Sequence, residues 1–135
     1  MPPDFICIGT QRCGTTWLHR ALSAHPAYWM PPFKELDFFS PEGPEGNRRD
    51  KMLWMYSGLG RQLRDGVEDR SELAWMATLV TALPKDLDWY RGLFGPAQGR
   101  ITGDISPAYF RLDDAGVARV RAALPGAHIV IMLRH

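Results

Sequence analysis

The residues most suited to chemistry form a loop with the glycine spacing of a phosphate-binding site, G-x-x-x-x-G. The glycines let the backbone turn sharply and point successive N–H groups inward, and the start of a following helix adds unsatisfied donors and the positive end of its dipole. This pattern predicts an anion-binding site, the alternative being a tight strand-to-helix turn without a ligand. The loop comprises Gly9, Thr10, Gln11, Arg12, Cys13, Gly14, Thr15 and Thr16.

The cation of this loop stands in an unusual place. Loops that bind nucleoside triphosphates carry lysine directly after the second glycine, where it reaches the terminal phosphates, followed by a magnesium-binding Ser or Thr. Here Thr15 occupies that position and the cation, Arg12, lies inside the loop. We therefore expect a smaller terminal group than a magnesium triphosphate. A P-loop kinase or NTPase-like nucleotide-binding protein stays the alternative function, and a non-catalytic nucleotide-binding module is a third.

The elements around the loop favour a strand before it and a helix after it. The apolar run 5–8 reads as a buried strand. A helix is expected over 15–24 and should end at His25-Pro26, because the residue before proline disfavours helical backbone. Its apolar stripe should be Trp17, Leu18, Ala21 and Leu22, with His19, Arg20 and Ser23 facing away.

Further elements follow the same alternation. Residues 28–39 should form a loop with a short extended piece, and 40–46 a loop. Asn47 is expected to cap a helix that runs toward Ser57, and Ser71 to cap another toward Leu83. Further helices are expected over 86–94 and from Asp113-Asp114, the latter with Val117, Val120 and Leu124 on one face. Strands are expected over 100–105 and 129–133, the last covered on both faces. Strands alternating with helices predict a parallel α/β sheet.

Composition limits the function classes. The 135 residues suffice for one domain, and 45% apolar with 23% charged residues is typical of a soluble globular protein. The net charge of +1 argues against a broad nucleic-acid or membrane surface, so an anion should be bound locally. No signal peptide or ~20-residue apolar span is visible. Cys7 and Cys13 make neither a disulfide framework nor a zinc site, so we expect a reduced, cytoplasmic protein.

The loop and several later segments resemble sulfotransferases that use 3′-phosphoadenosine-5′-phosphosulfate (PAPS). The string from Ile8 to Leu18 resembles their 5′-phosphosulfate-binding loop. Other segments match in the same order. His25-Pro26 with 34–39 is similar to the "HP…KE..FF" segment of the bacterial and heparan-sulfate-type branch, and 89–94 with 103–110 is similar to a "Y…F…GE.SP.Y" stretch. Residues 130–134 resemble the strand whose arginine binds the 3′-phosphate. The resemblance covers nearly the whole chain, 1–135, as one cofactor-binding domain.

The resemblance implies a P-loop NTPase-like three-layer sandwich with a central parallel sheet, and transfer of a sulfuryl group from PAPS, without a metal, to a hydroxyl or amine. The acceptor would be a small molecule or carbohydrate; its identity and the oligomeric state are unspecified. The chain stops at Arg134-His135, directly after a core strand. Because a parallel sheet needs a helix over that strand, we expect a truncated N-terminal portion, with the C-terminal part missing.

The resemblance also assigns cofactor-binding residues. Arg12 matches a position that is usually lysine, and because arginine keeps its proton it can stabilise charge but cannot act as a general acid. Arg134 would bind the 3′-phosphate, the alternative being a frayed chain end. Gly9, Asp104 and Arg134 each follow a predicted strand and should converge on one crevice. The implied cofactor-binding set is Gln11, Arg12, Cys13, Gly14, Thr15, Thr16, Trp17 and Arg134.

Two carboxylates are candidate general bases. Glu35 corresponds to the base of the heparan-type branch and would take the acceptor's proton, a contribution typically worth ~10²–10⁴ in rate. The alternative is a solvated Lys34–Glu35 surface pair. Asp104 is the second candidate, the alternative being a turn residue that caps the following segment. Ile105 replaces the branch's lysine, so a second catalytic cation must come from elsewhere, such as Lys34.

Two further groups are expected to be structural. The cluster Arg48, Arg49 and Lys51 should be a solvated face. Most aromatic side chains should pack in the core: Trp29, Phe33, Phe38, Phe39, Trp54, Trp75 and Trp89.

Overall fold

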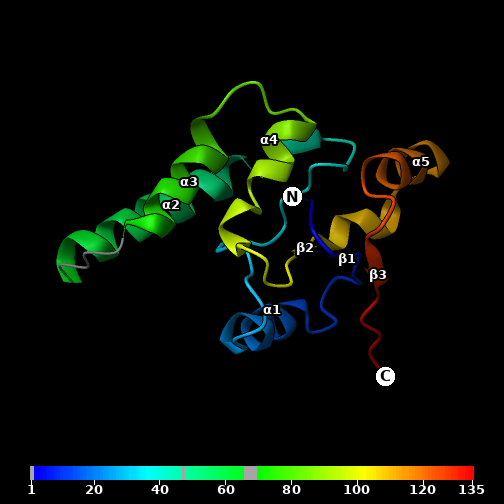
Figure 1. The fold of residues 1–135 in the computed structure, drawn as a ribbon, viewed down its shortest axis with the longest axis horizontal. Helices are drawn as coiled ribbons and strands as arrows, with labels where there is room; N and C mark the ends of the chain where they lie inside the picture. Colours follow the sequence, from blue (N-terminus) through cyan, green and yellow to red (C-terminus); the bar gives the residue numbers. More distant parts are fainter. Residues whose placement is uncertain (1, 47, 66–69) are drawn as a thin grey trace.

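A computed structural model describes residues 2–46, 48–65 and 70–135. Its centre is a three-stranded parallel sheet of order β2-β1-β3 (Figure 1). The strands are β1 (Phe5–Cys7), β2 (Gly103–Ile105) and β3 (His128–Val130). Ile6 of β1 is in register with Asp104 on one side and Ile129 on the other. The three carboxyl ends therefore meet at one edge, which confirms the predicted parallel α/β fold.

The helices form two layers on the sheet. Leu18 and Leu22 of α1 (Thr15–Ala24) pack in one apolar cluster with Phe5 and Cys7. A second cluster on the other face contains Ile6 together with side chains from three helices. These are α3 (Ser71–Thr81), α4 (Leu87–Gly92) and α5 (Asp114–Ala123). A further helix, α2 (Arg48–Asp65), contacts α3 (Figure 1).

Local sequence signals define most helix ends. The bounds of α1 are those predicted, and His25 after it is extended. The side chains of Asp86 and Asp113 cap α4 and α5 by accepting backbone N–H groups at 2.9 and 2.7 Å. The predicted cap Asn47 lies outside the described residues. The predicted end of α2 at Ser57 is wrong, because the helix continues to Asp65.

Three 3₁₀ helices complete the described elements: Gly43–Glu45, Gly95–Ala97 and Pro107–Arg111. Ser71, which was predicted to cap α3, is instead its first residue, with Arg70 at the N-cap, and the helix ends at Thr81 rather than at Leu83. No helix among the described residues is long and apolar enough to cross a membrane.

The aromatic residues that the sequence analysis assigned to the core lie in or against it. Phe39, Trp75 and Trp89 are buried, while the others pack against the same cluster partly exposed: Trp29, Phe33, Phe38 and Trp54.

Several predicted core positions are instead exposed. Trp17 of α1 is 66% exposed and Ala21 is also exposed, so the buried stripe is narrower than expected. His19 was expected to face away, yet its ring contacts the Pro31 carbonyl at 2.7 Å. Val117 is 56% exposed because α5 packs through Val120, Ala123 and Leu124. Strand β3 ends at Val130, and Ile129 within it and Ile131 after it are 55% and 47% exposed, so the predicted cover on both faces is wrong.

Candidate active site

The glycine loop (residues 9–16) connects β1 to α1 through left-handed backbone. Gly9, Arg12 and Gly14 have φ angles of 124°, 59° and 87°. A Cβ atom on Gly9 would also lie 3.3 Å from the Pro107 carbonyl oxygen, so this position requires glycine. Gly14 is the N-cap of α1, and no side chain of the described residues caps the helix. The first-turn N–H groups are therefore available to an anion.

The loop is attached to the C-terminal residues after β3. Thr10 N–H donates to the Met132 carbonyl at 3.2 Å, and Met132 N–H donates to the Gly9 carbonyl at 2.7 Å. Arg134 Nη1 donates to the Arg12 carbonyl at 3.5 Å. Inside the loop, the Thr10 hydroxyl contacts Cys13 Sγ. The chain after β3 therefore brings Arg134 beside the glycine loop.

A pocket of about 510 Å³ lies against the glycine loop. Three of its side chains are cations, namely Arg12, Lys34 and Arg134, against one carboxylate, Glu35. Of the predicted cofactor-binding residues, Cys13 and Trp17 do not line this pocket; the full lining is Gln11, Arg12, Gly14, Thr15, Thr16, Lys34, Glu35, Pro107 and Arg134. An anion in this space would meet both side-chain and helix-terminus charge.

A second pocket of about 290 Å³ adjoins the first. The two share Gln11, Glu35 and Pro107. The smaller pocket is lined mainly by polar groups, among them three carboxylates and one guanidinium; its lining is Gln11, Glu35, Asp37, Ser40, Glu42, Gly46, Pro107, Ala108 and Arg111. Glu35 therefore lies where a cation-rich space meets a carboxylate-rich one. The sequence interpretation missed Glu42 and Arg111, which carry no local motif.

Glu35 is fixed by its backbone and paired by its side chain. Its N–H donates to the Ile105 carbonyl at the end of β2 at 2.7 Å, and its φ of 62° is left-handed. Lys34 Nζ donates to Glu35 Oε1 at 2.8 Å, with the Glu35 side chain 41% exposed. The Lys34–Glu35 pair therefore exists, and both residues line the larger pocket. The role of Glu35 as general base stays a prediction.

Asp104 lies in a different place from the one predicted. It is the central residue of β2 rather than a residue beyond the strand, and it lines neither pocket. It points into the core, 1% exposed, and accepts hydrogen bonds from the hydroxyls of Ser106 at 2.7 Å and of Tyr90 and Tyr109 at 2.8 Å each. Burial raises the pKa of this carboxyl, while the three hydroxyl donors oppose the shift.

Lys51 is buried, so its prediction as part of a solvated cluster is wrong. The start of α2 covers the chain preceding it. Lys51 Nζ therefore donates to the carbonyls of Leu36 and Pro44, both at 3.1 Å, and of Gly46 at 2.9 Å. Desolvation lowers the pKa of Lys51, and the charge of Asp37 opposes this. This lysine holds both ends of the segment 36–46.

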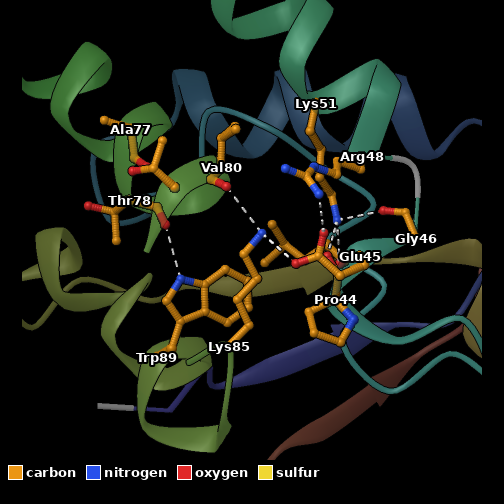
Figure 2. A network of polar contacts seen from close by, with 12 residues as sticks. Pro44, Glu45, Gly46, Arg48, Lys51, Ala77, Thr78, Val80, Lys85 and Trp89 are labelled. Atoms are coloured by element: carbon orange, nitrogen blue, oxygen red, sulfur yellow. Dashed lines mark hydrogen bonds and ion pairs between the residues drawn. The ribbon is translucent and has the colours of Figure 1, made fainter. Parts of the chain in front are cut away.

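The same segment is tied through Glu45 to the chain between α3 and α4. Its carboxylate pairs with Lys85 Nζ at 3.0 Å and, more loosely, with Arg48 at 3.8 Å (Figure 2). Lys85 Nζ also donates to the Val80 carbonyl at 3.3 Å and lies 5.7 Å from the centre of the Trp89 ring. The chain from 34 to 46, called here the carboxylate loop, is thus held from two sides.

Comparison with known proteins agrees with this geometry. The sequence model described as "Sulfotransferase family" matches residues 3–135, so the chain belongs to the sulfotransferase family. The crystal structure of a sulfotransferase from Alicyclobacillus acidocaldarius matches with a TM-score of 0.59 and 26% identity. The match covers 97% of this chain, which spans 44% of the length of that one. No curated protein matches.

The comparisons confirm the family and the P-loop-like α/β fold that the resemblance implied. The heparan-sulfate-type branch stays a prediction. Among the described residues, no cluster of three or more His, Cys, Asp or Glu side chains could hold a metal ion.

Proposed function

We propose that the chain binds PAPS in the larger pocket, called here the donor pocket, and transfers its sulfuryl group to a hydroxyl or amine in the smaller one, the acceptor pocket. The observation that carries this proposal is the position of Glu35, a residue that lines both spaces. A base at that junction can reach an acceptor proton next to the donor's sulfur. The cytoplasmic location stays a prediction.

The donor pocket suits a phosphate–sulfate anhydride. The N-terminus of α1 and the left-handed turns at Gly9 and Gly14 favour a bound anion. Arg12 and Arg134 add fixed positive charge on the same side. By the resemblance, Arg134 would bind the 3′-phosphate. The position after Gly14 holds Thr15 in place of the lysine that a triphosphate requires.

Transfer needs three coupled changes. The acceptor oxygen or nitrogen forms a bond to sulfur as the bond between sulfur and the 5′-phosphate oxygen breaks. The bonding electron pair stays on the phosphate oxygen, where Arg12 and the loop N–H groups stabilise the charge. The acceptor's proton passes to the Glu35 carboxylate, whose partner Lys34 is the second cation beside the reacting groups. The polar lining of the acceptor pocket suits a small molecule or a carbohydrate end.

Calorimetry with adenosine 3′,5′-bisphosphate and with magnesium ATP tests the donor. We expect the bisphosphate to bind at least about tenfold more tightly, because Arg134 would contact its 3′-phosphate and the loop lacks the triphosphate lysine. Preference for magnesium ATP would favour the kinase or NTPase alternative. Bisphosphate binding without sulfuryl transfer to any acceptor would favour the non-catalytic binding module.

A further inference from the structure

We infer that Asp104 is a positioning residue that orients the carboxylate loop, and with it Glu35, through the hydroxyls of Ser106 and Tyr109. The inference rests on the proposed function for its catalytic consequence. Its structural part concerns hydrogen bonds that can be tested without turnover. The buried carboxylate accepts hydrogen bonds from the two hydroxyls, and each hydroxyl accepts one from a backbone N–H group of the carboxylate loop.

Ser106 makes the first connection. Its hydroxyl donates to Asp104 Oδ1 at 2.7 Å and accepts the N–H of Asp37 at 3.2 Å. A hydroxyl has one proton, so donating it to the carboxylate directs the oxygen lone pairs toward the Asp37 N–H. Asp37 lies two residues after Glu35, and both have left-handed backbone, with φ of 56° and 62°. Such backbone persists only where surrounding contacts impose it.

Tyr109 makes the second connection in the same way. Its hydroxyl donates to Asp104 Oδ2 at 2.8 Å and accepts the N–H of Phe39 at 3.4 Å. Glu35 itself donates its N–H to the carbonyl of Ile105, the neighbour of Asp104 in β2. Alternate residues of the carboxylate loop, 35, 37 and 39, are thus hydrogen-bonded to the last residue of β2 and to the segment that follows it. A carboxylate at Asp104 only accepts hydrogen bonds, so both hydroxyls donate to it and their oxygens accept the N–H groups of the loop.

Tyr90 provides a matched control within the same network. Its hydroxyl also donates to Asp104 Oδ2 at 2.8 Å, and like Tyr109 it is buried. Both rings contact Phe39, a packing contact that phenylalanine would retain. Only the Tyr109 hydroxyl also accepts from the loop backbone. Tyr109→Phe and Tyr90→Phe therefore each remove one bond to Asp104, but only Tyr109→Phe removes a bond to the loop.

The experiment compares Tyr109→Phe, Ser106→Ala and Tyr90→Phe by amide hydrogen exchange, turnover and bisphosphate affinity. The first two should speed exchange in the segment 35–39 and lower kcat about tenfold or more, because small misplacement of a reacting group is costly. Affinity for adenosine 3′,5′-bisphosphate should stay within about twofold of the parent in all three. Tyr90→Phe should keep parental exchange in 35–39 and lower kcat by less than about threefold.

Each outcome separates the inference from the proposed function. Equal effects of Tyr90→Phe and Tyr109→Phe on exchange and kcat would show that the network only stabilises the core, and would overturn the positioning role. Parental exchange in both Tyr109→Phe and Ser106→Ala would overturn it too. If Tyr109→Phe does not fold, Ser106→Ala decides the matter. Failure of the parent chain to bind the bisphosphate would instead overturn the proposed function. The hydrogen-exchange comparison of the variants would still test whether the network orders the segment 35–39.

Discussion

The glycine loop and the carboxylate loop meet in one site but obtain their shapes differently. The glycine loop has left-handed backbone at two glycines, Gly9 and Gly14, and at Arg12, and it ends in a helix N-terminus. The carboxylate loop has glutamate and aspartate, Glu35 and Asp37, at left-handed positions. Its conformation depends on distant partners, such as the bond between Asp37 and Ser106, 69 residues later in the chain.

This difference predicts that donor affinity and turnover respond to different substitutions. The anion-binding half is shaped mainly by its own residues, and its distant bonds to Met132 join backbone groups, so it should tolerate side-chain changes elsewhere in the core. The half that carries the base relies on Lys51 and on the Asp104 network. Substitutions at those partners should therefore reduce turnover and stability more than donor affinity. Four substitutions test this contrast.

The largest effect is expected from Glu35→Gln. Removing the base should lower turnover by ~10²–10⁴. Affinity for adenosine 3′,5′-bisphosphate should stay the same or rise slightly, because a negative charge leaves an anion-binding pocket. Steady-state kinetics and calorimetry measure the two quantities. The exposed Glu72 at the start of α3 provides the matched control Glu72→Gln. Unchanged turnover in Glu35→Gln would place the base elsewhere.

Arg12→Ala should weaken bisphosphate binding by about 10–100-fold, the usual worth of a charge-assisted hydrogen bond. Calorimetry measures the affinity. Arg20→Ala is the control, because Arg20 is exposed on α1 and lines neither pocket. If both variants bind equally well, the guanidinium inside the glycine loop does not contact the donor.

Lys51→Met should lower the free energy of unfolding by about 1–3 kcal/mol, because three carbonyl groups lose their donor. Urea denaturation measures this. Arg49→Met on the same helix is exposed and should change stability by less than about 0.5 kcal/mol. Bisphosphate affinity of folded Lys51→Met should match the parent; a large loss would mean that the two loops are not independent.

The smallest effect is a pH dependence carried by Asp104. Burial raises its pKa in the folded state above the ordinary value of 3.8, so the folded state binds this proton more tightly than the unfolded state. Stability relative to Asp104→Asn should therefore increase as pH falls through the raised pKa toward 3.8. Urea denaturation of both proteins between neutral pH and about pH 4 measures the difference. A difference that shrinks on acidification would mean that the pKa is lowered.

The sequence predicted the parts of the fold that depend on neighbouring residues. The glycine loop, both bounds of α1 and the starts of α4 and α5 at Asp86 and Asp113 follow from local chemistry. Periodicity was less reliable for burial. Trp17 and Val117 lie on apolar stripes yet are exposed, because a stripe shows only what could be buried and not how wide the covered surface is.

The remaining features depend on contacts between distant segments. Lys51 sits in a charged stretch typical of a solvated helix face, and only the carbonyls that surround its Nζ explain its burial. Asp104 reads as a polar residue near a strand end, but its register with Ile6 directs it into the core toward Tyr90. The sequence identified the stretch that contains Ser106 and Tyr109 by resemblance, without indicating that their hydroxyls contact the carboxylate loop.

The most direct test of the convergence of the two loops is an NMR titration of the ¹⁵N-labelled chain with adenosine 3′,5′-bisphosphate. The largest amide shift changes should fall at Gly14, Thr15 and Thr16, with smaller changes at Lys34 and Glu35. Largest changes around the separate pocket lined by Phe38, Lys85 and Arg119, with residues 9–16 unaffected, would contradict the assignment of the donor pocket.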